Sequence, residues 1–200
     1  MPFIPPVTKA FMLICVGLFC LPIVVPSLAM LNFQMALWPL NTGRFEPWQP
    51  LTYAFLHGDA WHLFFNMLGL WMFGSELEAL WGGKRYAQLL VASALTAAAA
   101  QLVFTLLIGS GAPTVGASGA LFGLLLSYGL MFPDRMIMPL FPPIPMKAKV
   151  FVAVFGGLEV IFAWFNTNDG VAHLAHLGGM LGGFLMIRFW QGRSPFGRRR

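Results

Sequence analysis

A small set of polar side chains in this sequence stands inside or at the edge of strongly apolar segments. It comprises all four histidines together with one asparagine and one serine: His57, His62, Asn66, Ser118, His173 and His176. Ionisable or strongly hydrogen-bonding groups in an apolar membrane segment are costly, and they are functional candidates by default.

Ser118 and His176 have the residue types of a nucleophile and its general base. A serine hydroxyl is a weak nucleophile until a base takes its proton, and a neutral imidazole is the usual base near pH 7. Ser118 opens an apolar segment, where free backbone N–H groups favour a negative oxygen. His62 and Asn66 are four residues apart, so they share one helical face and could add side-chain donors. The set predicts a serine hydrolase with Ser118 and His176 as catalytic residues and His62 and Asn66 as oxyanion-stabilising residues.

The sequence shows no acidic residue at a depth that would orient His176, so we expect a two-residue dyad. His173, three positions before His176, or a backbone group are the alternatives for orienting its ring. Glu159 is interpreted as structural, as a hydrogen-bonding residue between helices. A metal site formed by His62, His173 and His176 is an alternative, but no carboxylate or cysteine accompanies it. We expect neither a metal nor a cofactor.

The elements that must position these residues are membrane helices. The chain is 58% apolar and 10% charged, whereas soluble domains carry about 25% charged residues. A helix needs about 20 apolar residues to cross a bilayer. Six segments qualify, and the fold prediction is an all-α bundle of six transmembrane helices in a single membrane domain spanning 1–200. The predicted spans are 11–31, 61–80, 86–108, 117–132, 148–165 and 171–190, and Pro22 and Pro26 predict a kink in the first of them.

The distribution of positive charge predicts the orientation. With six spans both termini lie on one side, and of the 12 lysines and arginines only Arg44 falls on the other side. Basic residues accumulate on the cytoplasmic side, so we expect both termini in the cytoplasm. The basic residues lie between apolar segments and not on one polar face, which argues against nucleic-acid binding. The aromatic-rich loop 34–58 lies partly in the membrane interface or is an ordinary outer loop.

Depth and glycine spacing both predict that the site residues meet. Counted at 1.5 Å per residue from the span ends, Ser118 lies roughly 8 Å and His176 roughly 10 Å below the outer boundary, and Asn66 is close to the same level. Gly119 and Gly123 in span 4, and Gly179 and Gly183 in span 6, have the small-xxx-small spacing of closely packed membrane helices. A contact between these faces would bring Ser118 within hydrogen-bonding reach of His176.

Four motifs in order give the chain a family resemblance. They are His57-x4-His62-x3-Asn66, GSELEALWGGKRY at 74–86, GASGALFG at 116–123 and AHLGGMLGG at 175–183. The sequence resembles the rhomboid intramembrane serine proteases in a compact bacterial six-span form, and the resemblance covers roughly 45–190.

The resemblance implies the nucleophile, base and oxyanion roles assigned above and a structural role for His57. It also implies cleavage of transmembrane segments of single-span membrane proteins near the outer face, in a bacterial inner (plasma) membrane. Span 5 and the following loop, 164–170, would form the substrate gate and cap, and loop 34–58 would dip into the membrane. The oligomeric state is left open.

Two non-enzymatic functions are alternatives to the protease hypothesis. A catalytically silent rhomboid-like protein would bind membrane clients without cutting them, but such proteins typically lose the serine or the histidine, and both are present. A transporter or proton relay would need polar residues along a whole pathway. Here they cluster at one level above an apolar cytoplasmic half.

Overall fold

The computed structural model describes residues 4–140, 143–165 and 171–192, and its regular structure is mostly helical. The helices are α1 (Pro6–Val24), α2 (Ala29–Met35), α3 (Gln49–Thr52), α4 (Ala60–Gly69), α5 (Ser75–Ile108), α6 (Ser118–Met131), α7 (Ala148–Phe165) and α8 (His173–Trp190). Two short strands, β1 (Met136–Ile137) and β2 (Met146–Lys147), form an antiparallel hairpin between α6 and α7. Single turns of 3-10 helix lie at Pro26–Leu28, Leu40–Thr42 and Tyr53–Phe55, and one π-helical turn at Leu70–Gly74 joins α4 to α5.

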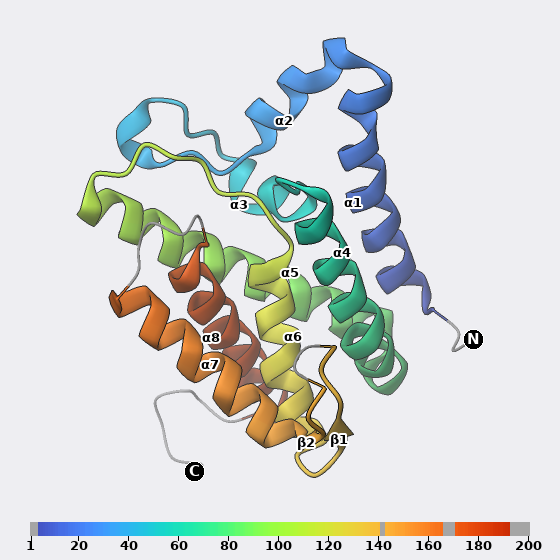
Figure 1. Cartoon of the computed structure of the whole chain (residues 1–200). Helices are drawn as coiled ribbons and strands as arrows, with labels where there is room; N and C mark the ends of the chain where they lie inside the picture. Colours follow the sequence, from blue (N-terminus) through green and yellow to red (C-terminus); the bar gives the residue numbers. More distant parts are fainter. Residues whose placement is uncertain (1–3, 141–142, 166–170, 193–200) are drawn as a thin grey trace.

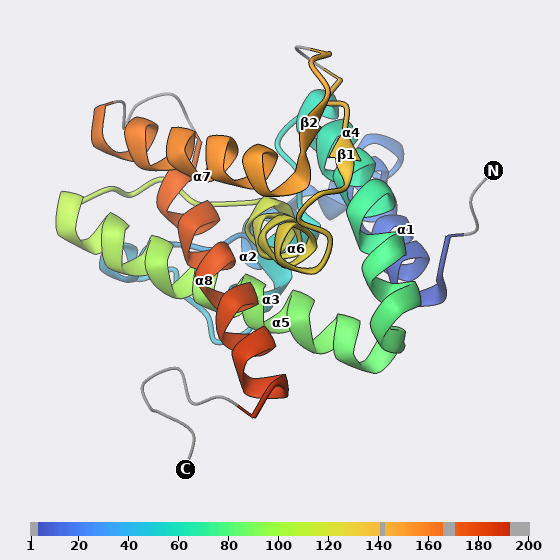
Figure 2. The same cartoon turned by 90° about the horizontal axis from the view of Figure 1, so that it is seen from below.

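Helix α6 lies at the centre of the molecule, with α4, α5, α7 and α8 around it (Figure 2). Its sequence is apolar or small on every face, which suits a helix packed on all sides. Helix α8 packs against both α5 and α6, while α1 lies on the outside against α4 and α5 (Figure 1). The start of α1, the bend within the first turns of α5 and the β1–β2 hairpin lie at one end of the molecule, and α2, α3 and the loop before α6 lie at the other (Figure 1).

The outer surface of the bundle is strongly apolar. Large side chains such as Leu107 (79% exposed), Val24 (76%) and Trp61 (72%) point away from the protein. Among the described residues, three helices are long and apolar enough to cross a membrane, namely Pro6–Val24, the 49-residue stretch Ala60–Ile108 and Ala148–Phe165, and Ser118–Met131 is apolar but shorter. An apolar surface of this extent is matched to lipid and not to water. The chain is a helical membrane protein.

Most predicted segments coincide with helices. Helix α7 has the predicted bounds, and α6 and α8 begin within two residues of theirs. The chain stays helical from Ala60 to Ile108 except at Gly82, whose φ of 75° and ψ of 158° turn it sharply between the second and third predicted segments. The predicted disturbance of the first segment is present as a break: α1 continues through Pro22, ends at Val24, and a 3-10 turn starts at Pro26.

Helix α1 starts five residues earlier than predicted, because its first turn is capped from another helix. The buried carboxylate of Glu78 in α5 accepts hydrogen bonds from the backbone N–H of Val7 (2.9 Å) and of Thr8 (2.7 Å), and from the Thr8 hydroxyl (2.8 Å). The first N–H groups of a helix have no partner within the helix, so these bonds satisfy them and fasten α1 to α5. Nearby, Glu76 forms an exposed ion pair of 3.2 Å with Arg135.

Candidate active site

Helices α6 and α8 meet through their glycines, as the spacing predicts. A Cβ atom on Gly183 would lie 2.6 Å from the carbonyl oxygen of Gly123, and one on Gly179 would collide with the carbonyl of Gly119. The two backbones are therefore in direct contact, and a side chain at either position would push them apart. The opposite glycine pair of α8, Gly178 and Gly182, faces α5 in the same way.

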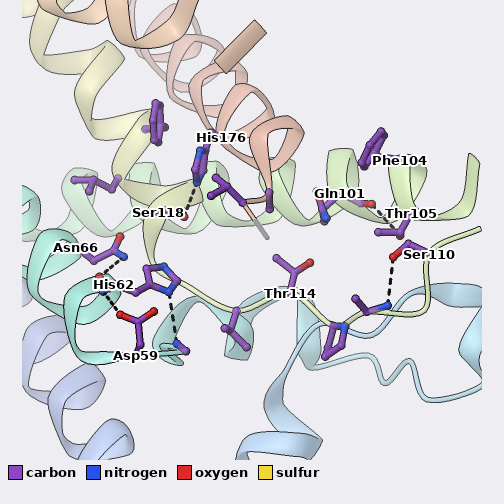
Figure 3. A pocket seen from close by; sticks show the side chains of 18 of the residues that line it. Asp59, His62, Asn66, Gln101, Phe104, Thr105, Ser110, Thr114, Ser118 and His176 are labelled. Atoms are coloured by element: carbon purple, nitrogen blue, oxygen red, sulfur yellow. Dashed lines mark hydrogen bonds between the residues drawn. The ribbon is translucent and has the colours of Figure 1, made fainter. Parts of the chain in front are cut away.

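This contact brings Ser118 and His176 together. Ser118 is the first residue of α6, His176 lies in the first turn of α8, and the Ser118 Oγ is 2.8 Å from the His176 Nε2 (Figure 3). The imidazole is stacked on the ring of Phe122, with 4.3 Å between centroids and 9° between planes. Phe122 thus fixes the plane of the His176 imidazole, and the Nε2 of that ring is hydrogen-bonded to Ser118.

The other two predicted residues face the same space from α4 (Figure 3). Asp59 caps this helix by accepting a hydrogen bond from the backbone N–H of His62 at 2.9 Å. The amide of Asn66 donates to the His62 carbonyl at 2.8 Å, which uses one of its two N–H groups and leaves the second for a ligand. His62, Asn66, Ser118 and His176 all line one cavity.

Gly116 allows the loop before α6 to pass close to His62. Its φ is 131°, a conformation that side chains rarely adopt, and a Cβ atom there would lie 2.7 Å from the His62 Nε2. The glycine of the GASG motif is therefore required twice, by its backbone conformation and by the space that the imidazole fills.

The cavity has a volume of about 670 Å³ and extends beyond the four predicted residues. It continues along the end of α5 past Gln101 and Thr105 to Ser110 and Thr114 in the following loop. Its size is within the range of pockets that hold small organic molecules, roughly 300–1,000 Å³. These additional lining residues were not predicted, because nothing in their spacing distinguishes them from other polar positions in apolar helices.

Glu159 lies closer to His176 than the sequence analysis predicted. Its Oε2 lies 2.7 Å from the Nδ1 of His173 and 3.0 Å from the Nδ1 of His176, so the expectation that no acidic residue reaches the depth of His176 is wrong. The interpretation of Glu159 as a hydrogen-bonding residue between helices is confirmed by its bond to His173, which joins α7 to α8. The helix rise could have found it: Glu159 lies less than two turns before the end of α7, about 9 Å deep, which matches the depth of His176.

The same three side chains are the described residues that come closest to a metal-ligand set. Ligand atoms of Glu159, His173 and His176 all lie within 4.8 Å of one another, and His62 is not in this group. Ligands of a tetrahedral zinc ion at 2.0–2.1 Å would be about 3.3 Å apart. The separations of 2.7 and 3.0 Å from the Glu159 Oε2 are shorter than that, so in this arrangement both imidazoles contact the carboxylate directly, and His173 is hydrogen-bonded to it.

His57 lies in the loop before α4 and packs edge-on against His62, with 5.0 Å between ring centroids. Burial lowers its pKa to about 4, with a smaller contribution from His62. The ring is therefore neutral at physiological pH. Of the predicted gate and cap, residues 166–170 lie outside the described residues.

Comparison with known proteins adds three findings. A family model described as Rhomboid domain matches residues 44–191. The chain is 28% identical over 194 residues to a protein named Rhomboid protease GlpG from Yersinia pestis, an alignment that covers 94% of this chain and 64% of the relative. It is 34% identical over 137 residues to Rhomboid protein 1, mitochondrial, from Saccharomyces cerevisiae, covering 66% of this chain and 38% of the relative. The chain thus spans less than two thirds of the length of these relatives.

Proposed function

Since the chain belongs to the rhomboid family, we propose that it is an intramembrane serine endopeptidase that cleaves transmembrane segments of membrane proteins near the outer face. The observation that carries the proposal is the 2.8 Å contact between the Ser118 hydroxyl and the His176 Nε2 at the wall of a cavity among apolar helices. A serine in an apolar helix ordinarily bonds to its own backbone, as Ser127 does to the carbonyl of Gly123 at 2.8 Å. Ser118 instead faces a base.

The proposed reaction follows from these positions. The Ser118 Oγ attacks the carbonyl carbon of the scissile peptide while its proton passes to the His176 Nε2. The resulting oxyanion accepts hydrogen bonds from the Ser118 backbone N–H, the His62 imidazole and the free N–H of Asn66. The tetrahedral intermediate collapses, the C–N bond breaks, and His176 returns the proton to the leaving amine. Water then repeats the sequence on the acyl-enzyme and releases the second product.

The proposed membrane arrangement is a single rhomboid-type domain over 1–200 with six crossings and both termini in the cytoplasm. The stretch Ala60–Ile108 supplies two of these crossings because Gly82 turns the chain, and α1, α6, α7 and α8 supply the others. The short α6 needs to cross only part of the bilayer, since the loop before it would reach down to the level of Ser118. The membrane would be the inner (plasma) membrane of a bacterium.

The proposed substrates are single-span membrane proteins. A peptide bond in a helix is shielded by its own hydrogen bonds, so a segment must unwind before it can reach Ser118. We therefore expect cleavage near small or helix-breaking residues.

Labelling by a serine-directed fluorophosphonate tests the nucleophile. The purified full chain should react, Ser118→Ala should not, and His176→Ala should react far more slowly. Ser127→Ala is the matched control, because its hydroxyl lies on the same helix but bonds only to backbone, and it should label like the wild type. Equal labelling of wild type and Ser118→Ala would overturn the assignment.

Cleavage of single-span substrates in liposomes then tests proteolysis. Wild type should produce two fragments and Ser118→Ala none. Binding without cleavage by a protein that still labels at Ser118 would favour the alternative of a catalytically silent protein that binds membrane clients.

A further inference from the structure

Glu159 belongs to the proposed catalytic site through His176. We propose that the Glu159 carboxylate, with His173 as its second partner, is a positioning residue that holds the His176 imidazole in the tautomer and orientation needed to accept the Ser118 proton. The inference rests on the proposed function. It replaces the predicted dyad by a serine, a histidine and an acid contributed by three different helices.

The tautomer requirement follows from the 2.8 Å contact between Ser118 and His176. A neutral imidazole carries its proton on one nitrogen only. If the Nε2 is to accept the serine proton, the proton of the ring must be on Nδ1, and a buried Nδ1–H needs an acceptor. The Oε2 of Glu159, 3.0 Å from this Nδ1, is the acceptor that the structure supplies.

The contact is close but imperfectly aligned in the resting site. The 3.0 Å separation lacks the direction of a hydrogen bond, and the same oxygen is bonded to the His173 Nδ1 at 2.7 Å. Hydrogen bonds of catalytic groups are often poorly aligned in the free enzyme and tighten when the reaction begins. When His176 becomes an imidazolium, its attraction to the carboxylate increases, so the contact strengthens in the transition state.

Glu159 is buried, and a charged side chain at a buried position suggests a role that a neutral side chain could not fill. Glu159 is 9% exposed, and His173 (6%) and His176 (7%) beside it are equally sheltered. An ionised side chain within a membrane helix is costly. If the side chain only joined α7 to α8, a neutral glutamine would accept the same hydrogen bonds without that cost. Only a carboxylate also stabilises an imidazolium.

His173 has a supporting position in this cluster. Its ring is perpendicular to that of His176, with 6.3 Å between centroids, and packs against Phe162 of α7. By donating to the Glu159 Oε2, it fixes the carboxylate between the two rings. His176 is then held on three sides, by Phe122 on its face, Ser118 at Nε2 and Glu159 at Nδ1.

Glu159→Gln in the full chain is the decisive variant, because it keeps the shape and removes the charge. We expect kcat for a single-span substrate in liposomes to fall at least about tenfold, with KM within about twofold and the fluorophosphonate reaction slowed in parallel. Glu159→Asp, which retains the charge, should recover part of the lost kcat. Glu78→Gln is the matched control: it neutralises the other buried glutamate, which lies away from the cavity, and should lower the melting temperature while leaving kcat of the folded protein unchanged.

Two results would overturn the proposal while leaving the function intact. One is wild-type kcat and labelling in Glu159→Gln. The other is a loss of kcat in Glu159→Gln that only follows a loss of folded protein and is not relieved by Glu159→Asp. If the wild type itself neither labels nor cleaves, the proposed function fails instead.

Imidazole nitrogen NMR tests the positioning without reference to activity. In protein carrying ¹⁵N-histidine at neutral pH, the His176 signals should show the proton on Nδ1 in the wild type and a mixture of tautomers in Glu159→Gln. A wild-type proton on Nε2 would contradict the proposal even if neither variant could be purified in folded form.

Discussion

Glu78 in α5 and Glu159 in α7 are both buried carboxylates, but they are surrounded by different partners. Glu78 accepts hydrogen bonds from two backbone N–H groups and a hydroxyl at the start of α1, none of which changes its charge near neutral pH. Glu159 faces two imidazoles, one of which contacts the hydroxyl of Ser118. Burial alone therefore does not separate a structural acid from one that we propose to act in catalysis. The partners differ in kind: Glu78 meets backbone N–H groups and a hydroxyl, whereas Glu159 meets two imidazoles.

The two carboxylates also connect different pairs of helices. Glu78 joins α1 to α5 by completing the first turn of α1, which resembles helix capping by a residue remote in sequence. Glu159 joins α7 to α8 beside the cavity. We expect changes at Glu78 to alter the stability of the protein and changes around Glu159 to alter its rate of catalysis.

The largest effect is expected at the cavity, for Asn66→Ala. Removing one donor to an oxyanion lowers kcat by about 10²–10³, or roughly 2.7–4 kcal/mol of barrier. The melting temperature should change little, because within the described part of the chain the Asn66 side chain is hydrogen-bonded only to the His62 carbonyl of its own helix. Steady-state cleavage measures kcat and thermal unfolding measures the melting temperature, and both are determined on the same preparation. An unchanged kcat would remove Asn66 from the oxyanion site.

Glu78→Ala should act in the opposite sense. It leaves the N–H groups of Val7 and Thr8 without acceptors at the start of α1, and a buried donor without a partner costs about 1–3 kcal/mol. We expect a loss of roughly 3 kcal/mol in unfolding free energy, with kcat of the folded fraction unchanged.

Glu76→Gln is the control for Glu78→Ala, since Glu76 lies two residues away in an exposed ion pair with Arg135. Exposed pairs contribute about 0–1 kcal/mol. An equal loss for the two variants would mean that the hydrogen bonds to α1 do not distinguish Glu78 from a surface glutamate.

The smallest effect concerns His57, whose pKa is lowered by burial to about 4 from an unfolded value of 6.5. The folded state binds fewer protons at this site, so its stabilising contribution is complete above pH 6.5 and is lost as the pH falls toward 4. Between pH 6.5 and 5.5 the loss should be roughly 1 kcal/mol. Thermal unfolding across this range should show a shallower pH dependence in His57→Gln. Parallel curves for the two proteins would contradict the neutral, buried state of His57.

The parts of the fold that sequence could predict depend on local composition. The bounds of α7 follow from a largely apolar segment, and the α6–α8 contact follows from glycine spacing, which is a property of each helix separately. The meeting of Ser118 and His176 follows in turn from that contact. Whether these residues perform the proposed catalysis stays a prediction.

What could not be predicted depends on groups remote in sequence. Polar residues near the start of α1 make hydropathy place its beginning too late, because the acceptors that stabilise the first turn come from Glu78, 70 and 71 positions away. The depth of Glu159 was within reach of helix-rise counting. The direction of its side chain toward α8 depends on the rotation of α7, which its apolar sequence does not specify.

The backbone contact between α6 and α8 has a consequence for the order of biosynthesis. Ser118 and His176 are 58 positions apart, and His176 lies on the last described helix. During synthesis from the N-terminus, Ser118 enters the membrane without His176, the residue proposed to take its proton. If the proposed function is correct, the nascent chain therefore cannot cleave other membrane proteins until α8 has been inserted and its glycines have packed against α6.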